Sequence, residues 1–333
     1  MSGVTMRDIG KKAGVSAVTV SKALAGKTGV SEEMRQKIIR IADEMGYVNP
    51  LTVQAAERRA LDVGILVPEH FFGKDSYYAM FYKQLVRALT EAGHFVLMEM
   101  VSREAEETLS LPNLLRSDHA DAIILLGEPK KQYLRMVTAS TVPIIYLDFY
   151  DEKASADAVV GDNSYGCYRL TSHLIRNGHT DIGFLGNIHA TSSIMDRYLG
   201  YYKAMLSHRL DIRPECIVSD RDDENELARF DLPEKLPSAF VCNCDVMARR
   251  LIRQLKEMGI RVPEDVSVVG FDDYSNEGDE SPALSTFRMD SEAMVRTAVR
   301  LVDERCSGVQ KPFGRVVVGG TPIYRESEIP KGI

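Results

Sequence analysis

The most constraining feature of this 333-residue sequence is a helix stop followed almost at once by a helix start, close to the N-terminus. Thr5 and Asp8 stand at capping-box spacing, so a first helix is expected to begin there. Gly14 predicts its end, because glycine adopts the left-handed conformation of a helix C′ position at the least cost. Ser16, a residue type preferred at helix N-caps, follows only two positions later. Two helices must therefore meet at a very short turn.

The next two segments continue this helical pattern. A second helix is expected from Ala17 to Leu24, and Ser31 is expected to cap a third after a loop. The apolar residues of the third helix recur with a period of about 3.6 and form one stripe: Met34, Ile38, Ile41, Ala42 and Met45. Two short helices joined by a tight turn, with a third packed across them, predict a helix-turn-helix.

Such a unit presents its second helix to the major groove of DNA. The expected outward positions are Ala17, Val18, Ser21, Lys22 and Ala25. Lys22 would donate to guanine or phosphate, whereas Ala17 and Val18 would pack on thymine methyl groups. Ser16, Thr19 and Ser31 suit phosphate oxygens. The alternative is a three-helix packing module that binds nothing.

The charge distribution favours the DNA-binding alternative. The net charge of −7 alone would argue against nucleic acid, but residues 1–60 hold ten Lys and Arg against six Asp and Glu. A segment carrying +4 therefore precedes a remainder carrying −11. A small basic head on an acidic body indicates that only the head meets phosphate.

Other compositional features predict a cytoplasmic protein. No run approaches the roughly 18 apolar residues of a membrane span, and the N-terminus lacks the apolar region of a secretory signal. The five cysteines form no disulfide framework and suit a reducing compartment. Cys242 and Cys244 resemble half of a metal site, but no partner pair has zinc-finger spacing. Buried thiols, no metal and no cofactor are therefore expected.

Residues 50–61 are expected to link residues 1–49 to a body at 62–333. Asn49-Pro50 ends the third helix, because the residue before proline avoids the helical region. Thr52–Arg59 is open to two interpretations, a short hinge helix or a flexible linker.

The body alternates short apolar strands with amphipathic helices, which predicts parallel, doubly wound α/β sheets. Two sets of these elements indicate two lobes, about 62–160 plus 290–320 and about 161–289 plus 321–333. Ligands of open α/β sheets bind beyond the carboxyl ends of the strands, so an effector is expected between the lobes. The expected strands are Val63–Val67, Phe95–Met100, Ala122–Leu126, Val142–Leu147, Ile182–Leu185, Ile217–Val218, Ala239–Cys242, Val266–Phe271 and Arg315–Val318. The expected helices are Met80–Ala92, Tyr165–Asn177, Asp196–Ser207, Val246–Met258 and Ser291–Arg305.

Specific motifs over nearly the whole chain resemble the LacI/GalR family of repressors. In the head these are Val4–Ile9, Ala13–Ser16, Thr19–Ser21 and Gly46-Tyr47. In the body they are Gly161-Asp162-Asn163, Gly178-His179, Arg197-x-x-Gly200 and Pro263–Asp273. The resemblance implies a periplasmic-binding-protein-like sensor core. His179 is expected to cap a loop, and Asp162 and Asn163 to form a turn.

The resemblance also implies the DNA contacts of the head. The family's variable recognition positions match Ala17, Val18 and Lys22, and Tyr47 matches a tyrosine that contacts the DNA backbone. Ala56 stands where the family wedges a leucine into the minor groove, and alanine is a poor wedge. The full DNA-contacting set is expected to be Thr5, Ser16, Ala17, Val18, Thr19, Ser21, Lys22, Ser31, Tyr47 and Ala56.

For the effector, Arg197 and Asp272 match family positions that hold the ligand. Two departures matter: Cys244-Asp245 replaces the usual Asn-Asp pair, and Arg221 stands where relatives place an aromatic residue. A second arginine favours an effector with a carboxylate or phosphate group, although a sugar or sugar derivative is the general expectation. The expected lining is Phe71, Tyr77, Asp148, Arg197, Arg221, Cys244 and Asp272.

Two competing functions are disfavoured. An enzyme is unexpected because no phosphate-binding loop, nucleophile elbow or zinc-protease motif is present. A secreted sugar-binding protein would fit the body but not residues 1–50. We expect a homodimer that reads a pseudo-palindromic DNA site, with effector binding between the lobes altering DNA affinity. Thr321–Ile333 has no leucine heptad, so a dimer is preferred over a tetramer.

Overall fold

The computed structural model describes residues 4–24, 29–45, 59–72, 77–116, 119–151, 153, 155–221, 229–274, 282–308 and 311–331. The chain forms two compact units, Met1–Ala60 and Leu61–Ile333. Among the residues described, no helix has both the length and the apolar character needed to cross a membrane. Ala25, Tyr47, Ala56 and nearly all of the expected linker lie outside the described residues.

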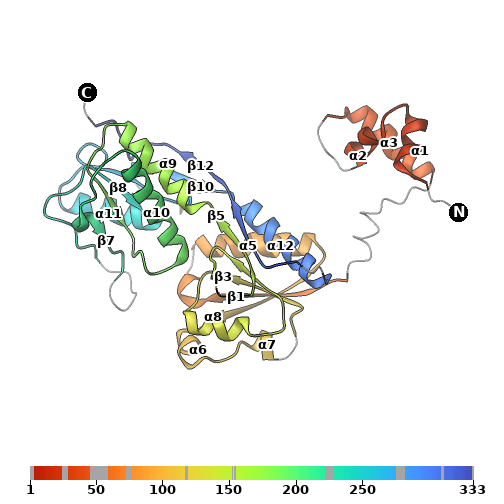
Figure 1. Cartoon of the computed structure of the whole chain (residues 1–333), viewed down its shortest axis with the longest axis horizontal. Coiled ribbons are helices and arrows are strands. Elements are labelled where there is room, and N and C mark those ends of the chain that lie inside the picture. The colour runs from red at the N-terminus through yellow and green to blue at the C-terminus, as the bar shows by residue number, and fades with distance from the viewer. Residues whose placement is uncertain are drawn as a thin grey trace. The chain divides into compact units, whose positions relative to one another are not determined.

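The first unit consists of helices α1 (Met6–Ala13), α2 (Ala17–Leu24) and α3 (Glu32–Glu44) (Figure 1). The predicted capping box is confirmed: the Thr5 N–H donates to Asp8 Oδ2 at 2.9 Å, and the Asp8 N–H donates to Thr5 Oγ1 at 3.4 Å. Gly14 ends α1 with a φ of +79°, as its position predicted. The stop and restart therefore set the turn between α1 and α2.

One fully buried side chain from each helix forms the centre of the head: Ile9, Val20 and Ile38. A polar contact reinforces this packing, because Arg35 on α3 donates to the carbonyl of Ala23 near the end of α2 at 3.0 Å. The donor satisfies a carbonyl that the helix itself leaves unpaired. The third helix thus holds the first two by apolar burial and by a hydrogen bond.

The first lobe of the larger unit is a six-stranded parallel sheet in the order β11-β5-β4-β3-β1-β2. Helices α5 and α12 cover one face, and α6, α7 and α8 cover the other (Figure 1). The strands are β1 (Asp62–Pro68), β2 (Phe95–Val101), β3 (Ala122–Leu126), β4 (Ile144–Leu147), β5 (Asp157–Gly161) and β11 (Arg315–Val318). The helices are η1 (Glu69–Phe71), α5 (Tyr77–Glu91), α6 (Arg103–Thr108), α7 (Asn113–Arg116), α8 (Lys131–Thr138) and α12 (Ser291–Cys306).

The second lobe has a four-stranded parallel sheet in the order β7-β6-β8-β9. Helices α9 and α10 pack on one face and α11 on the other. The elements are α9 (Asn163–Arg176), β6 (Ile182–Leu185), α10 (Ser192–Ser207), η2 (Pro214–Cys216), β7 (Ile217–Val218), β8 (Ala239–Cys242), α11 (Asp245–Glu257) and β9 (Ser267–Val269). An antiparallel pair, β10 (Thr286–Met289) and β12 (Gly320–Ile323), completes the lobe.

The predicted class of two parallel doubly wound sheets is confirmed, but several elements were missed or misplaced. Strands β5, β10 and β12 were not predicted, because their apolar runs are short or interrupted by polar residues. Helix α10 begins at Ser192 and not at Asp196, since the Thr191 side chain caps it by accepting from the Ile194 N–H at 3.2 Å. Helix α5 likewise begins at Tyr77, earlier than predicted.

The chain passes between the lobes after β5, between β10 and α12, and between β11 and β12. Each lobe is therefore assembled from segments far apart in the sequence. The carboxyl ends of strands from both sheets meet at the cleft between the lobes, where loops are free to carry ligand-binding residues.

The core of the head leads to a stability prediction. We expect Ile38→Ala to lower the free energy of unfolding of the head by about 2–5 kcal/mol, because a fully buried isoleucine leaves a cavity when it is truncated. A three-helix unit of this size has little stability to spare. Thermal unfolding followed by circular dichroism should show the head melting at a lower temperature.

The matched control is Gln36→Ala, which removes only an exposed hydrogen bond to Glu32 one turn away on the same helix. Its effect should stay within about 0.5 kcal/mol. Comparable losses from both substitutions would contradict the proposed role of Ile38 as the centre of the head.

Candidate functional site

Helix α2 presents one exposed face whose residues differ from those on its buried face. Val20 and Ala23 are buried, whereas Val18, Ser21 and Lys22 are exposed at i, i+3 and i+4. Val18 is 65% exposed, so its apolar side chain is accessible for contact. This face combines an apolar contact, a hydroxyl and a cation.

Hydroxyl groups mark the beginning of the same helix. Ser16 Oγ accepts from the Thr19 N–H at 3.1 Å and lies 2.9 Å from Thr19 Oγ1. Ser31 caps α3 in the same way, accepting from the Met34 N–H at 3.4 Å. Thr5 is committed differently, because its hydroxyl donates to Asp8 at 2.6 Å. Of the expected DNA contacts, Thr5 therefore has the clearest structural role within the head itself.

The structure adds two cations that the sequence reasoning missed. Arg7 and Lys11 are exposed one turn apart on α1, and they line a shallow hollow together with Ser16 and Ala17. Their i, i+4 spacing was a visible signal, because it places both on one helix face. The hollow brings these cations next to the turn that precedes α2.

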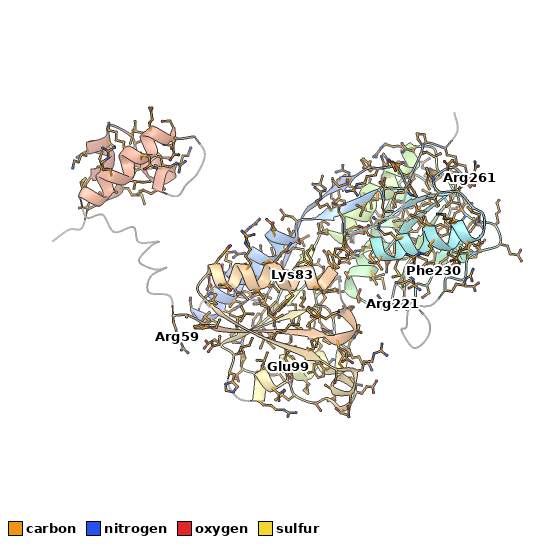
Figure 2. All side chains as sticks on the ribbon, turned by 180° about the vertical axis from the view of Figure 1, so that it is seen from behind. Arg59, Lys83, Glu99, Arg221, Phe230 and Arg261 are labelled. Carbon is orange, nitrogen blue, oxygen red and sulfur yellow. The ribbon has the colours of Figure 1, made fainter. Side chains whose placement is uncertain are left out.

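In the larger unit, the seven residues expected at the effector site line a single cavity of about 140 Å³ between the lobes. They come from both lobes, and Figure 2 shows Arg221 at the edge of the second lobe nearest the first. The cavity is also lined by residues that the sequence did not predict, which include Thr191, Ser193, Asn243 and Tyr274. The topology thus gathers side chains that follow β1, β4, β7, β8 and β9.

Arg197 on α10 is the most constrained residue of this cavity. Its guanidinium donates from Nε to Asn163 Oδ1 at 2.8 Å and from one terminal nitrogen to the Asn243 carbonyl at 2.6 Å. The other terminal nitrogen lies 3.1 Å from Asp272 Oδ1. The group also stacks on the Phe271 ring at 4.1 Å. The earlier expectation for Asn163, a turn residue only, is therefore incomplete, because its side chain orients Arg197.

Two carboxylates face Arg197 from opposite lobes, and both have strained backbones. Asp148 has a φ of +72° and Asp272 a φ of +106°, conformations that non-glycine residues rarely adopt. Burial raises the pKa of Asp272 to about 7, and Arg197 opposes this rise only in part. Burial likewise raises the pKa of Asp148, which accepts a hydrogen bond from Tyr78 Oη at 2.9 Å.

Asp245 and Cys244 have more passive roles. The Asp245 carboxylate accepts from Thr286 Oγ1 at 2.6 Å and from the Tyr274 N–H at 2.8 Å, so it ties the segment after β9 to the beginning of β10. Burial raises the pKa of the Cys244 thiol to about 12, which keeps it neutral. Cys244 therefore contributes a small neutral surface at the position where the LacI/GalR family usually has the amide of an asparagine.

Some polar atoms of the lining have no hydrogen-bond partner within the part of the chain that the structure describes. Tyr77 Oη and Asn243 Oδ1 are two such buried atoms, and both residues line the cavity. Buried polar groups are rarely left unsatisfied, and exceptions often mark a ligand or solvent site. The arrangement is suited to a ligand that presents several hydroxyl or amine groups.

No metal centre is formed by the described residues, among which no group of three or more His, Cys, Asp or Glu side chains converges. Cys242 is fully buried, and burial raises its pKa far above the usual range of a thiol. His179 lies within hydrogen-bond distance of Ser238 Oγ and of the Ile329 carbonyl, both at 3.0 Å, in agreement with its expected structural role.

Comparisons with known proteins agree with both units. A family model described as bacterial regulatory proteins, lacI family, matches residues 5–49, and a periplasmic binding protein-like domain matches residues 171–328. The HTH-type transcriptional repressor PurR of Haemophilus influenzae (strain PittEE) is 27% identical over 336 residues. That alignment covers 97% of this chain and 98% of the relative.

Solved structures give the same result. A complex of the transcriptional regulator CelR with cellobiose is 25% identical, covers 97% of this chain and 99% of that chain, and has a TM-score of 0.68. The lac repressor dimer bound to operator and the anti-inducer ONPF is 22% identical, covers 98% and 99% of the two chains, and has a TM-score of 0.66. The second likeness concerns the fold alone.

Asp272 leads to a prediction about pH. Its pKa in the folded chain is about 7, above the ordinary 3.8, so the folded state binds this proton more tightly than the unfolded state. The stability contributed by this group is complete below the ordinary pKa of 3.8, and it is lost progressively as the pH rises from there to about 7. Between about pH 5 and about pH 8, wild-type protein should lose more unfolding free energy than Asp272→Asn does.

Urea unfolding of the larger unit at both pH values measures this difference. The control is Asp265→Asn, because Arg261 lowers the pKa of that exposed carboxyl to about 2, so it does not titrate in this range. If the unfolding free energy of wild type and that of Asp272→Asn changed equally with pH, the raised pKa assigned to Asp272 would be contradicted.

Proposed function

Because the chain belongs to the LacI/GalR family of transcriptional regulators, we propose that it represses transcription by binding operator DNA under the control of a small molecule. The observation that carries this proposal is the pairing of an exposed α2 face with a cavity in the other unit that residues of both its lobes line. The proposed action is non-enzymatic. Because the proposed operator is part of the chromosome, we place the protein in the cytoplasm.

The proposed DNA contacts divide into readers and positioners. Val18 and Lys22, with Ala17 and Ser21, face the bases of the major groove, because they form the exposed side of α2. Ser16, Thr19 and Ser31 lie at the N-termini of α2 and α3, where hydroxyl groups and backbone N–H groups can donate to phosphates. Arg7 and Lys11 extend this phosphate-binding surface.

The proposed effector is a neutral, polyhydroxylated molecule of about one sugar ring. The cavity has Asp148, Asp245 and Asp272 on its walls, and each of the three guanidinium nitrogens of Arg197 already has one partner within the protein. Arg221 lies 3.5 Å from Asp220, whose carboxylate offsets its charge. These charges argue against the anionic effector that Arg221 alone favoured in the sequence. The complex of CelR with cellobiose supports a carbohydrate.

We further propose a homodimer that reads a pseudo-palindromic operator, as symmetry of the protein is mirrored in the site. The lac repressor of similar fold was solved as a dimer on its operator. An effector that contacts both lobes would favour either the more open or the more closed arrangement of the lobes. The change in arrangement would in turn alter the affinity of the protein for DNA. The coupling is reciprocal, so DNA must change effector affinity by the same factor.

Lys22→Gln tests the recognition face. We expect it to weaken binding to a selected operator by about 5- to 100-fold, because a single base or phosphate contact contributes about 1–3 kcal/mol. Fluorescence anisotropy with operator chosen from a random pool measures the loss. Wild-type affinity should also fall steeply as salt is raised, since phosphate contacts release counterions.

The control for this variant is Lys256→Gln, which removes an exposed charge from α11 in the other unit. It should bind operator like wild type. An unchanged affinity of Lys22→Gln would remove this residue from the proposed readers, and a failure of wild type to select any DNA sequence would reject the proposed function.

Isothermal titration with matched sugars tests the effector class. We expect neutral monosaccharides to bind more tightly than their carboxylate or phosphate derivatives, by about tenfold or more, because the cavity carboxylates repel an anion. Arg221→Gln should reduce neutral-sugar binding only slightly. The control is Arg261→Gln, at a distant position of the same lobe, and its sugar binding should be close to that of wild type (Figure 2). Tighter binding of the anionic derivatives, lost in Arg221→Gln, would overturn the assignment.

A further inference from the structure

A second cavity lies between the two lobes, next to the one assigned to the effector. Its volume is about 350 Å³, and it is formed by α8, by the loop after β4, by the loop after β6 and by the beginning of α10. Thr191 lines both cavities. The second cavity falls within the size range of small-molecule sites.

Four basic side chains line this second cavity. Lys131, Arg135 and Lys153 belong to the first lobe and His189 to the second, and all four are exposed. None of them forms an ion pair with any acidic residue in the described ranges of the chain. Their neighbour Lys130, in contrast, is paired with Glu107 at 3.0 Å.

Lys131 and Arg135 place two like charges close together, of which Lys131 is offset in part by Glu128. They lie four residues apart on α8, so their like charges share one helix face. Such a pair destabilises a helix, and Lys153 adds to the same positive field. An anion in the cavity would relieve this repulsion.

Two acidic side chains also line the cavity, and both accept hydrogen bonds from neighbouring residues of the same lining, while Glu128 in addition interacts electrostatically with Lys131. Glu128 Oε2 accepts from the Ser192 N–H at 2.8 Å and from Ser192 Oγ at 2.9 Å, and so occupies the N-terminus of α10. Asp151 Oδ1 accepts from the Lys153 backbone N–H at 2.7 Å. The helix terminus is therefore closed to a ligand, and the basic side chains are what the cavity offers.

We propose that this second cavity binds a small phosphorylated molecule, with the phosphate group held by Lys131, Arg135 and Lys153 and reached by His189 from the opposite lobe. The planar guanidinium of Arg135 suits bidentate contact with phosphate, and the lysines supply point charges. The two cavities then have opposite preferences, hydroxyl groups in the acidic one and phosphate in the basic one. Binding here goes beyond the proposed function and does not depend on it.

Isothermal titration of the full chain with inorganic pyrophosphate, and separately with D-glucose 6-phosphate, tests the proposal. We expect saturable binding at one site per chain that weakens as salt is raised. The double variant Lys131→Gln with Arg135→Gln should weaken it by about tenfold or more, since two charge-assisted contacts are lost. Both substituted positions are exposed, and an unchanged thermal unfolding curve verifies the fold.

The matched control is Arg296→Gln with Arg300→Gln, which removes two exposed charges at the same i, i+4 spacing on α12. Its binding should equal that of wild type. The proposal would be overturned if neither probe showed saturable binding up to about 10 mM, or if the two double variants lost the same amount of binding affinity. So would a loss confined to Arg221→Gln, which places the anion in the first cavity. Operator binding of the ligand-free protein is scored separately, so failure here leaves the proposed function intact.

Discussion

The buried guanidinium of Arg197 is the interaction on which the ligand-binding region depends. Transfer of a charge from water into the protein is costly unless every donor finds a partner. Here Asn163 from α9, the Asn243 carbonyl after β8 and Asp272 after β9 supply those partners, and Phe271 covers the group. One side chain thus fixes the relative positions of the ends of two strands and two helices.

These partners influence what the neighbouring cavity can recognise. Each nitrogen of Arg197 is already held by the protein, and three carboxyl groups share the cavity with it, which disfavours a second carboxylate or a phosphate there. The strained backbone of Asp272 is consistent with this interpretation, because such strain persists where the surrounding structure requires a side chain in one place. Burial keeps the pKa of this carboxyl near 7, so the group sits between charged and neutral forms.

The sequence alone predicted the helix-turn-helix and most strands correctly, because caps and apolar periodicity are local signals. It failed where tertiary contacts decide: β10 and β12 exist because each supplies the other with hydrogen bonds, although neither has a long apolar run. The seven expected effector residues do line one cavity; Phe71, Tyr77 and Asp148 were expected from their places after predicted strands, and the others from the resemblance. The role of Asn163 and the gathering of Lys131, Arg135, Lys153 and His189 had no local signal, since segments distant in sequence bring them together.

Helix α10 connects the two cavities mechanically. Its first turn is tied to the first lobe through Ser192 and Glu128, and Tyr150 donates to Asp196 at 3.1 Å. One turn later the same helix carries Arg197. The helix cannot shift easily against α9, because a Cβ at Gly200 would lie 2.1 Å from the Ser164 carbonyl oxygen, which shows how closely the two backbones pack. A ligand that changes the distance between Glu128 and Ser192 must therefore move α9 and α10 as one body, and with them the walls of the other cavity. If both cavities bind ligands as proposed, this shared helix would couple the occupancy of one to that of the other through the closure of the lobes.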